Sequence, residues 1–360
     1  MPLFNVFNLI FGFGNVHGTN QNDFIIGSFC DDDIKAGDGN DIVLGLFGDD
    51  KISGGLGNDL IFGGAGKDDV AGGDGDDWLY GGSGDDVVTG NKGSDKMFGG
   101  RGDDLLVWNN GDGSDLMDGG KGYDTQQVNF DTDLVNTDLQ NDDVAEFSVT
   151  DKGIQFARIE VNGQSDAGLF QLDIRNTEVQ ETNFGGGDDT AVITEDVLNK
   201  IKLDLDGGDG VDTLDFGGAS GPVSVNLASG AIEIDNGAGQ DASAVNFENV
   251  IGTDSNDIIT GNDEDNIIRG GAGNDIMSGG AGADTFVFFE EDAGVDVILD
   301  FEIGVDQLAF FTTDPDVTTE NLLGNLTQVG DDVELALNNK VITFEDAVVT
   351  DFGADDFMIA

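Results

Sequence analysis

Apolar residues recur at every ninth position along the first part of the chain. From Gly18 to Val107 the sequence divides into ten nine-residue blocks with no change of phase, and the eighth residue of each block is apolar. These residues are Ile25, Ile34, Val43, Ile52, Ile61, Val70, Leu79, Val88, Met97 and Leu106. Side chains alternate between the two faces of a strand, so the seventh and ninth residues should point outward when the eighth points inward. The pattern predicts one short strand per block.

The sixth residue of every block is aspartate. These residues are Asp23, Asp32, Asp41, Asp50, Asp59, Asp68, Asp77, Asp86, Asp95 and Asp104. Glycine predominates at positions one, two and four, where it allows positive φ angles and lets the main chain approach a neighbour or an ion closely. We therefore expect each block to be a glycine turn followed by a strand. A single block cannot bury its one apolar residue, so the blocks must stack.

More copies of the block follow the first array. A two-residue insertion near Trp108 precedes blocks with Asp115 and Asp124, isolated copies carry Asp189 and Asp212, and a second array from Gly252 carries Asp257, Asn266, Asp275 and Asp284. Two blocks per turn of a coil would place residues 18 apart side by side in one sheet, with strands about 4.8 Å apart. The repeats thus predict a solenoid.

Blocks such as residues 63–71 and 81–89 fit the pattern GGxGxDxUx, in which U is apolar. The chain resembles the RTX, or haemolysin-type calcium-binding, repeat family. The resemblance implies an all-β fold, a parallel β-roll with an irregular β middle region and a C-terminal β cap. It also implies that each Ca²⁺ is held between successive turns by the position-six aspartate and main-chain carbonyls. The candidate ligands are then the ten aspartates of the first array together with Asp115, Asp124, Asp189, Asp212, Asp257, Asp275 and Asp284. Gln21 and Cys30, which replace the glycine at position four, and Asn266 weaken their own sites.

The chemistry of the repeat favours calcium. Carboxylates and main-chain carbonyls are hard oxygen donors, and Ca²⁺ accepts six to eight of them more readily than Mg²⁺ with its strict octahedron. Zinc is disfavoured because the chain has one histidine, His17, and one cysteine, Cys30.

The chain is strongly acidic, with 73 acidic residues against 14 basic ones and a formal charge of −59. Nucleic acid and anionic membrane surfaces should therefore repel it, and cations are its natural partners. Without metal the crowded carboxylates repel one another and a chain rich in glycine and aspartate has little reason to collapse. We expect calcium binding and folding to be one event.

Composition suggests five regions. They are an apolar N-terminal segment (1–17), a first RTX β-roll (18–127), an irregular β region (128–206), a second RTX β-roll region (207–287) and a C-terminal cap (288–360). Alternating runs at 146–149, 154–161 and 169–174 predict strands that form either less regular coils of the solenoid or a small β-sandwich. The tail should contain strands near 333–337 and 341–344 and a short helix at 319–323.

The two ends of the chain predict its destination. The first thirteen residues are apolar, but no basic residue precedes Lys35 and no small-residue cleavage site follows, so they do not fit a secretory signal. They are also too short to span a membrane. The final acidic-then-apolar residues 355–360 are similar to the C-terminal signal of type I secretion substrates. We expect an extracellular protein exported by the type I secretion machinery.

No catalytic motif emerges from the sequence. HExxH is missing, one histidine cannot supply its two zinc ligands, and no GxSxG nucleophile elbow occurs. The sequence favours a non-enzymatic calcium-binding protein. Three alternatives stay open: an adhesin or matrix protein with the roll as a spacer, a polysaccharide-acting enzyme with its site in 128–206, and an ice- or surface-binding protein.

The outward positions of one expected sheet are apolar. They include Phe24, Leu60, Phe62, Trp78, Tyr80 and Phe98, whereas the same positions of the opposite sheet are mainly polar. Soluble monomers seldom expose a contiguous apolar patch of several hundred Å². We expect either that residues 3–13 or a later part of the chain cover this face, or that it docks a second copy, a polysaccharide or another protein. Either way, Trp78 should be shielded.

Overall fold

The computed structural model is all-β apart from one short helix, α2 (Thr319–Gly324), and one 3₁₀ turn, η2 (Ala354–Asp356), in the residues that it describes. These are 7–109, 112–129, 143–150, 153–161, 171–175, 179–184, 187–193, 202–234, 242–314, 317–337 and 340–360. No helix among them is long and apolar enough to cross a membrane. The chain forms two compact units, Met1–Thr137 with Ser148–Gly185 and Asp138–Phe147 with Gly186–Ala360. The predicted all-β class is confirmed.

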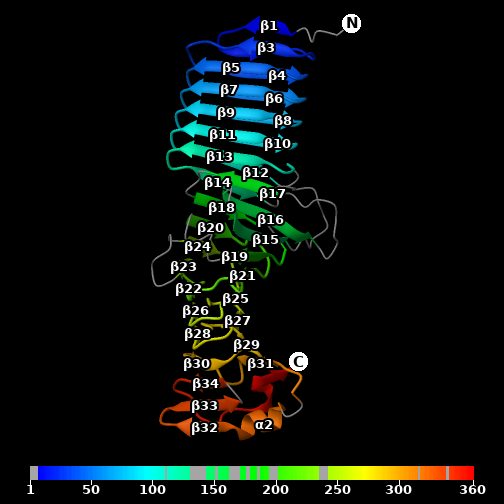
Figure 1. Ribbon diagram of the computed structural model, residues 1–360. Helices are drawn as coiled ribbons and strands as arrows, with labels where there is room; N and C mark the ends of the chain where they lie inside the picture. Colours follow the sequence, from blue (N-terminus) through cyan, green and yellow to red (C-terminus); the bar gives the residue numbers. More distant parts are fainter. Residues whose placement is uncertain are drawn as a thin grey trace. The chain divides into compact units, whose positions relative to one another are not determined.

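The first unit is built from two parallel sheets that the chain enters alternately (Figure 1). One sheet, which we call sheet A, contains β1 (Asn8–Phe11), β3 (Asp23–Ile26), β5 (Ile42–Phe47), β7 (Leu60–Ala65), β9 (Trp78–Ser83), β11 (Lys96–Arg101), β13 (Leu116–Lys121), β17 (Gln171–Arg175) and β16 (Gly153–Val161). Sheet B contains β2 (Asn15–His17), β4 (Asp33–Asp38), β6 (Lys51–Leu56), β8 (Asp69–Asp74), β10 (Val87–Lys92), β12 (Leu105–Asn109), β14 (Thr125–Asn129) and β18 (Val179–Asn183). Residues 18 apart are partners, as in Leu60 with Trp78, which confirms the predicted β-roll of two blocks per coil.

The eighth-position residues form the core between the two sheets. From Ile25 to Leu106 each of them is at most 1% exposed. The turns need glycine where successive coils touch. Gly55 has a φ of +117°, and a Cβ atom there would collide with the carbonyl oxygen of Gly37 in the preceding coil. At Gly55, glycine is therefore favoured for steric as well as conformational reasons.

The regular coils give way to irregular ones after β12. Trp108 is buried and its Nε1 donates a hydrogen bond to the carbonyl oxygen of Gly113, 3.0 Å away, so the inserted loop is held by the core. The strands β17 and β18 then pair in parallel with β13 and β14, while β16 pairs with β17 in antiparallel fashion. Of the two alternatives for 128–206, less regular coils are what the first unit shows. Parts of that region, which is also the segment of the polysaccharide-acting alternative, lie outside the described residues.

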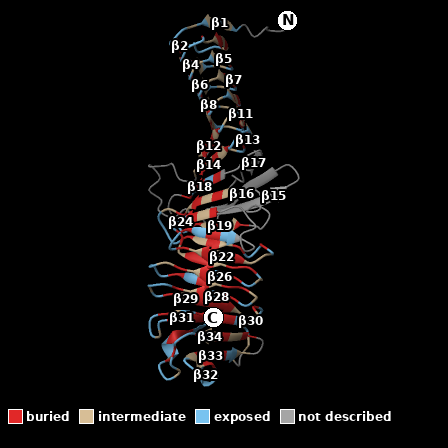
Figure 2. Ribbon diagram, turned by 90° about the vertical axis from the view of Figure 1, so that its left-hand side faces the viewer, coloured by how far each residue is buried: buried red, intermediate tan, exposed pale blue. Residues whose placement is uncertain are grey.

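The second unit has the same two-sheet construction with shorter strands. One sheet contains the first part of β15 (Asp143–Thr150), β19 (Thr190–Ile193), β21 (Thr213–Asp215), β25 (Asn249–Ile251), β27 (Ile267–Arg269), β29 (Thr285–Phe289), β31 (Gln307–Phe311) and β35 (Phe357–Ile359). The other contains β20 (Lys202–Asp206), β24 (Ala242–Val245), β23 (Ala231–Ile234), β22 (Val223–Asn226), β26 (Ile258–Thr260), β28 (Ile276–Ser278), β30 (Gly294–Ile298), β34 (Lys340–Phe344), β33 (Asp332–Leu337) and β32 (Leu326–Val329). Figure 2 shows buried residues in red along β22, β26 and β28.

An aromatic cluster closes the second unit at its C-terminal end. The rings of Phe301, Phe344 and Phe352 lie with centroids 5.0–5.7 Å apart, and Phe286 and Phe357 extend the cluster. The antiparallel strands β32, β33 and β34 follow α2. The predicted tail strands and helix are confirmed by β33, β34 and α2.

The N-terminal strand extends the roll instead of covering it. In β1, Leu9 pairs with Phe24 and Phe11 with Ile26, and Leu9 and Phe11 are 59% and 67% exposed. Trp78 is itself 44% exposed. The expectation that residues 3–13 or a later segment shield the apolar face is therefore wrong for the described residues; 3–6 lie outside them. The hydrogen bonds of β1 to the open edge of β3 explain why it stacks in register.

Candidate calcium sites

The position-six aspartates of the first unit form two rows, one along each edge of the roll. Asp41, Asp59, Asp77, Asp95 and Asp115 lie at the turns that lead from sheet B into sheet A. The turns on the opposite edge carry Asp50, Asp68, Asp86, Asp104 and Asp124. All ten side chains are at most 3% exposed. The roll thus presents two columns of buried carboxyl groups rather than one.

One oxygen of each carboxyl group belongs to the framework. Asp59 Oδ1 accepts a hydrogen bond of 2.7 Å from the main-chain N–H of Asp41, and Asp77 Oδ1 accepts one of the same length from Asp59. The pattern continues in both rows up to Asp124, which accepts from Asp104 at 3.0 Å. Position-six aspartates therefore join each coil to the coil before it.

The second oxygen is buried without a hydrogen-bond partner. This holds for Oδ2 of Asp41, Asp50, Asp59, Asp68, Asp77, Asp86, Asp95, Asp104 and Asp115 in the first unit and of Asp212 and Asp275 in the second. Except at Asp41 and Asp115, each such oxygen lies over the position-one glycine of its own turn. A Cβ atom added at Gly63 would lie 2.6 Å from Asp68 Oδ2 and 2.7 Å from the carbonyl oxygen of Gly81 in the next coil. A carboxylate oxygen and a carbonyl oxygen thus converge on a space that only glycine leaves open.

Burial raises the pKa values of these aspartates. Removal from water is the largest cause, and nearby carboxylates add to it, so the pKa rises to about 7 for Asp59 and about 8 for Asp77 and Asp115. The same causes raise the pKa of Asp275 to about 7 in the second unit. An isolated buried carboxylate is costly, and a nearby cation would offset that cost.

These donors fit Ca²⁺. They are all oxygens, and no group of three or more His, Cys, Asp or Glu side chains converges anywhere in the described part of the chain. An ion here would take few carboxylates and complete its shell with main-chain carbonyls and water, which the variable coordination of Ca²⁺ tolerates. The free Oδ2 oxygens and the glycine-lined spaces are therefore suited to this ion.

Three of the candidate aspartates are satisfied without an ion. Asp23 accepts from Asn8 Nδ2 at 2.8 Å and from the N–H of Thr19 at 2.5 Å. Asp32 accepts from the N–H groups of Gly14 and Ser28 at 2.5 and 2.6 Å.

Asp257 accepts from the N–H groups of Val223 and Thr253 at 2.8 and 2.6 Å. Asn266 is held in the same way, because Asn262 donates its N–H to Asn266 Oδ1 at 2.8 Å. In all four blocks the residue at position two is Thr, Ser or Asn instead of glycine.

The remaining candidates are placed as follows. Asp189 donates its N–H to Asp212 Oδ1 at 2.7 Å, and Asp284 accepts from the N–H of Asn266 at 2.9 Å, so both belong to the same framework in the second unit. Asp275 also interacts electrostatically with the buried ammonium of Lys340, whose Nζ has no hydrogen-bond partner. There the protein itself places a cation near the carboxyl group.

The sequence pattern missed three acceptors that play the same framework role in the second unit. Asp296 and Asp306 accept from the N–H groups of Asp275 and Asp284 at 3.1 and 3.0 Å, and Glu248 accepts from Asp212 at 2.8 Å. Their spacings of 21, 22 and 36 residues break the period of nine. The triplet of aspartate, any residue and an apolar residue, which persists at 296–298 and 306–308, was the available signal.

A second ladder runs outside the first. Position-five residues accept N–H groups from the next coil, as Asn40 Oδ1 does from Asn58 at 3.1 Å and Asp49 Oδ1 does from Lys67 at 2.8 Å. These side chains are exposed, so they close the turns without needing an ion.

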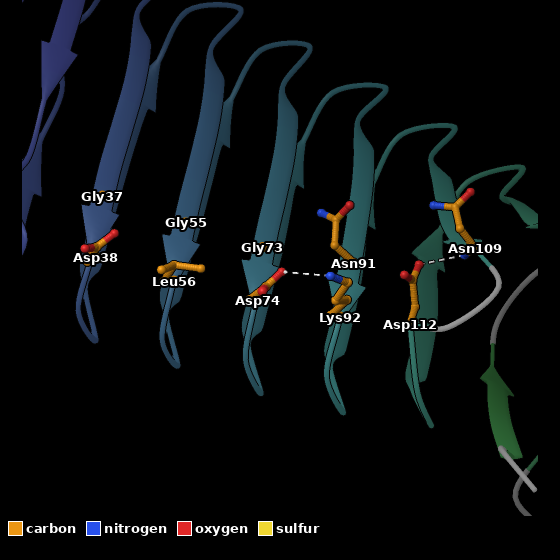
Figure 3. Close-up of a pocket in the computed structure, with 10 residues that line it drawn as sticks. All are labelled: Gly37, Asp38, Gly55, Leu56, Gly73, Asp74, Asn91, Lys92, Asn109 and Asp112. Carbon is orange, nitrogen blue, oxygen red and sulfur yellow. Dashed lines mark hydrogen bonds and ion pairs between the residues drawn. The ribbon is translucent and has the colours of Figure 1, made fainter. Parts of the chain in front are cut away.

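A groove of about 1030 Å³ follows one edge of the first unit (Figure 3). Its lining comes from positions two and three of successive turns and not from the position-six aspartates. Asp38, Leu56, Asp74 and Lys92 succeed one another there, with Lys92 and Asp74 in an ion pair of 3.9 Å. The groove combines acidic, basic and apolar side chains, which together favour no particular ligand. The buried carboxyl rows are therefore the stronger candidate site.

A comparison with known protein families identifies the repeats. The family model described as RTX calcium-binding nonapeptide repeat (4 copies) matches residues 12–43, 36–70, 44–79, 71–106, 111–126 and 251–286. These residues of the chain are RTX calcium-binding nonapeptide repeats. Both RTX arrays expected from the sequence are among the matched residues. No curated protein matches the chain.

Among solved structures, the extracellular lipase LipA from Serratia marcescens matches this RTX chain with 18% identity and a TM-score of 0.26. The match covers 89% of this chain and 45% of the lipase, so the chain spans less than half of that protein's length. A likeness at this level says nothing about activity.

Proposed function

We propose that this RTX protein binds several Ca²⁺ ions along the two edges of its roll and folds as it binds them. The observation that carries the proposal is the column of buried Oδ2 oxygens that have no hydrogen-bond partner. The aspartates with this feature are Asp41, Asp50, Asp59, Asp68, Asp77, Asp86, Asp95, Asp104 and Asp115 in the first unit and Asp212 and Asp275 in the second. Asp124 in the first unit and Asp189 and Asp284 in the second occupy the same repeat position and are secondary candidates.

Not every position-six aspartate is a calcium ligand in this proposal. Asp23, Asp32 and Asp257 already have hydrogen bonds to both carboxyl oxygens, so we assign them to the framework. This assignment narrows the ligand set that the repeat pattern suggested.

The energetics support coupled folding. At a calcium concentration ten times the Kd of a site, binding to the folded state contributes about 1.4 kcal/mol per site. Nine sites, one for each such aspartate of the first unit, would contribute about 13 kcal/mol, comparable to the whole stability of a typical domain, about 5–15 kcal/mol. The metal-free roll, in contrast, buries carboxyl groups that have no counter-ion.

Circular dichroism during a calcium titration tests this function. In calcium-depleted buffer at pH 7.5 we expect little strand signal, and millimolar Ca²⁺ should produce it. The same concentration of Mg²⁺ serves as the matched control and should not, because its octahedral shell is strict. A full strand signal in calcium-depleted buffer would contradict the proposal.

We further propose that the protein works outside the cell after type I export. The acidic-then-apolar end of the chain supports this, and low cytosolic calcium would keep the chain unfolded for transport. In a host that carries a type I system, removal of residues 301–360 should retain the protein in the cell, whereas removal of residues 1–13 should not. Secretion of the first truncation would refute the route.

We also propose that the roll has no enzymatic activity of its own. His17, the single histidine, is exposed on β2, and the sequence lacks HExxH and GxSxG. Screening the calcium-loaded chain against ester and polysaccharide substrates tests this. Turnover that disappears with an alanine substitution in 128–206 would establish the polysaccharide-acting alternative instead.

A further inference from the structure

The outer face of sheet A in the first unit is a continuous apolar surface. Two columns of outward side chains run across seven strands, and we call them the apolar face. They are Leu9, Phe24, Ile42, Leu60, Trp78, Lys96 and Leu116 in one column and Phe11, Ile26, Leu44, Phe62, Tyr80, Phe98 and Asp118 in the other. Lys96 and Asp118 are its only charged members, on a chain whose formal charge is −59.

The rings on this face stack on one another. Phe62, Tyr80 and Phe98 have centroids 4.8 Å apart and planes within 8° of parallel. Their faces are therefore occupied by their neighbours, and their edges point outward. Lys96 Nζ lies over the Trp78 ring at 4.0 Å and covers that ring as well. Binding of a sugar polymer uses free ring faces, so this arrangement disfavours a polysaccharide.

The size and period of the apolar face suit another β-roll. Seven strands about 4.8 Å apart, of which the two columns cover about 10 Å each, give an area of about 340 Å². Burial of that area on two partners gives about 700 Å², the size of a weak, concentration-dependent interface. A second roll also presents side-chain rows at the same strand spacing, so the ridges of one face can enter the grooves of the other.

We infer that the apolar face docks a second copy of this chain and that two rolls pair face to face about a two-fold axis. A closed symmetric pair buries the same patch on both partners and leaves none exposed. The face is also the surface of the first unit where two such acidic chains meet with fewest carboxylates between them. Because the face exists only when the roll is folded, the pairing rests on the proposed calcium function and should require Ca²⁺.

Sedimentation velocity of the calcium-loaded full chain over a concentration series tests the pairing. We expect the mass to rise from 37.6 kDa to twice that value as concentration increases. Leu60→Lys places a charge at the centre of the face and should weaken association by about tenfold or more. Lys96 shows that this column accepts a lysine without loss of the fold. Leu105→Lys, at the same repeat position on sheet B, is the matched control and should pair like the wild type.

Tryptophan quenching gives a second readout. Trp108 is buried and Trp78 is 44% exposed, so acrylamide should reach Trp78 in the monomer and lose access as the pair forms. A wild type that folds with calcium and stays monomeric, or that pairs equally well with Leu60→Lys, overturns this inference and leaves the calcium function intact. Failure of calcium to produce strands would instead remove the proposed function itself.

Discussion

The blocks that open each repeat array and the blocks that follow hold the same aspartate in different ways. In the opening blocks, Thr19, Ser28 and Thr253 at position two turn their N–H groups inward and bind the carboxyl group. In the later blocks, position two has a positive φ, as in Gly64 at +125°, and the carboxylate oxygen has no such donor. The difference shows that position two, as well as position six, decides whether a block needs a cation.

The sites of Asp23 and Asp32 are disfavoured for a different reason from the one that the sequence suggested. The sequence drew attention to Gln21 and Cys30 at position four, whereas the structure places the difference at position two. Leu46 and Asn91 support this reading, because both keep the left-handed conformation at position two, with φ of +87° and +67°. The following aspartates, Asp50 and Asp95, retain a free Oδ2.

An opening block that needs no metal also makes structural sense. In these blocks the N–H groups of the preceding coil and of the block's own turn already reach the carboxyl group, as those of Gly14 and Ser28 do for Asp32. These hydrogen bonds replace the ion and give the following coils a template. The same solution at the start of both arrays indicates a common requirement of roll ends.

The largest predicted effect is that of pH, because it acts on all the later blocks at once. Burial raises the pKa of Asp59 to about 7 and of Asp77 to about 8 above the unfolded value of 3.8. The metal-free roll therefore holds protons that the unfolded chain releases, and its stability falls as pH rises from about 4 to about 8. In calcium-depleted buffer we expect more strand signal at pH 5.5 than at pH 8. The opposite order would show that these carboxyl groups are not buried unpaired.

Calcium binding should show the complementary dependence. Protons and Ca²⁺ compete for the same oxygens, so calcium affinity should rise between pH 6 and pH 8. Calorimetry in two buffers of different ionisation enthalpy would measure the protons released per ion. No proton release near pH 7 would contradict the raised pKa values.

A substitution in a later block should have opposite effects with and without calcium. Asp77→Asn keeps the Oδ1 acceptor but replaces the charged oxygen with an N–H donor, close to the carbonyl oxygen of Gly90. With calcium at ten times Kd, we expect a loss of at least one ion and about 1.4 kcal/mol in the free energy of unfolding. Without calcium the variant should be more stable than the wild type. Urea unfolding in both conditions measures this.

The matched variant in an opening block is Asp32→Asn. Its carboxyl group binds N–H donors, so it should bind as many ions as the wild type. Equal loss of ions from both variants would erase the distinction between the two kinds of block.

The smallest predicted effect is a gain of binding. Thr253→Gly removes the side chain and allows a positive φ at position two, which should release Asp257 Oδ2 from the N–H of residue 253. We expect up to one additional ion per chain and, without calcium, a loss of about 1 kcal/mol because glycine is more flexible in the unfolded chain. Equilibrium dialysis with radioactive calcium can count the ions. Thr260→Gly, in the strand β26, controls for the loss of a threonine and should add none.

The sequence predicted the roll well because one period carried both the apolar core and the turns. Ile52 and Val70 are partners as the spacing of 18 requires, and the C-terminal strands appear where alternation placed them. It could not distinguish carboxyl groups that are already hydrogen-bonded, because residue type at position two does not fix the main-chain direction: Leu46 and Asn91 have a positive φ as Gly64 does. Asp296 and Asp306 were not predicted because insertions shifted them off the period of nine. In the structure they still accept N–H groups from Asp275 and Asp284.

The most direct test is an anomalous diffraction map of crystals grown with calcium. The account predicts calcium peaks beside the Oδ2 oxygens of Asp41, Asp59, Asp77 and Asp95 on one edge and of Asp50, Asp68, Asp86 and Asp104 on the other. It predicts no peak in the opening blocks beside Asp23, Asp32 and Asp257. Peaks at the opening aspartates, or none beside Asp59 and Asp77, would contradict it.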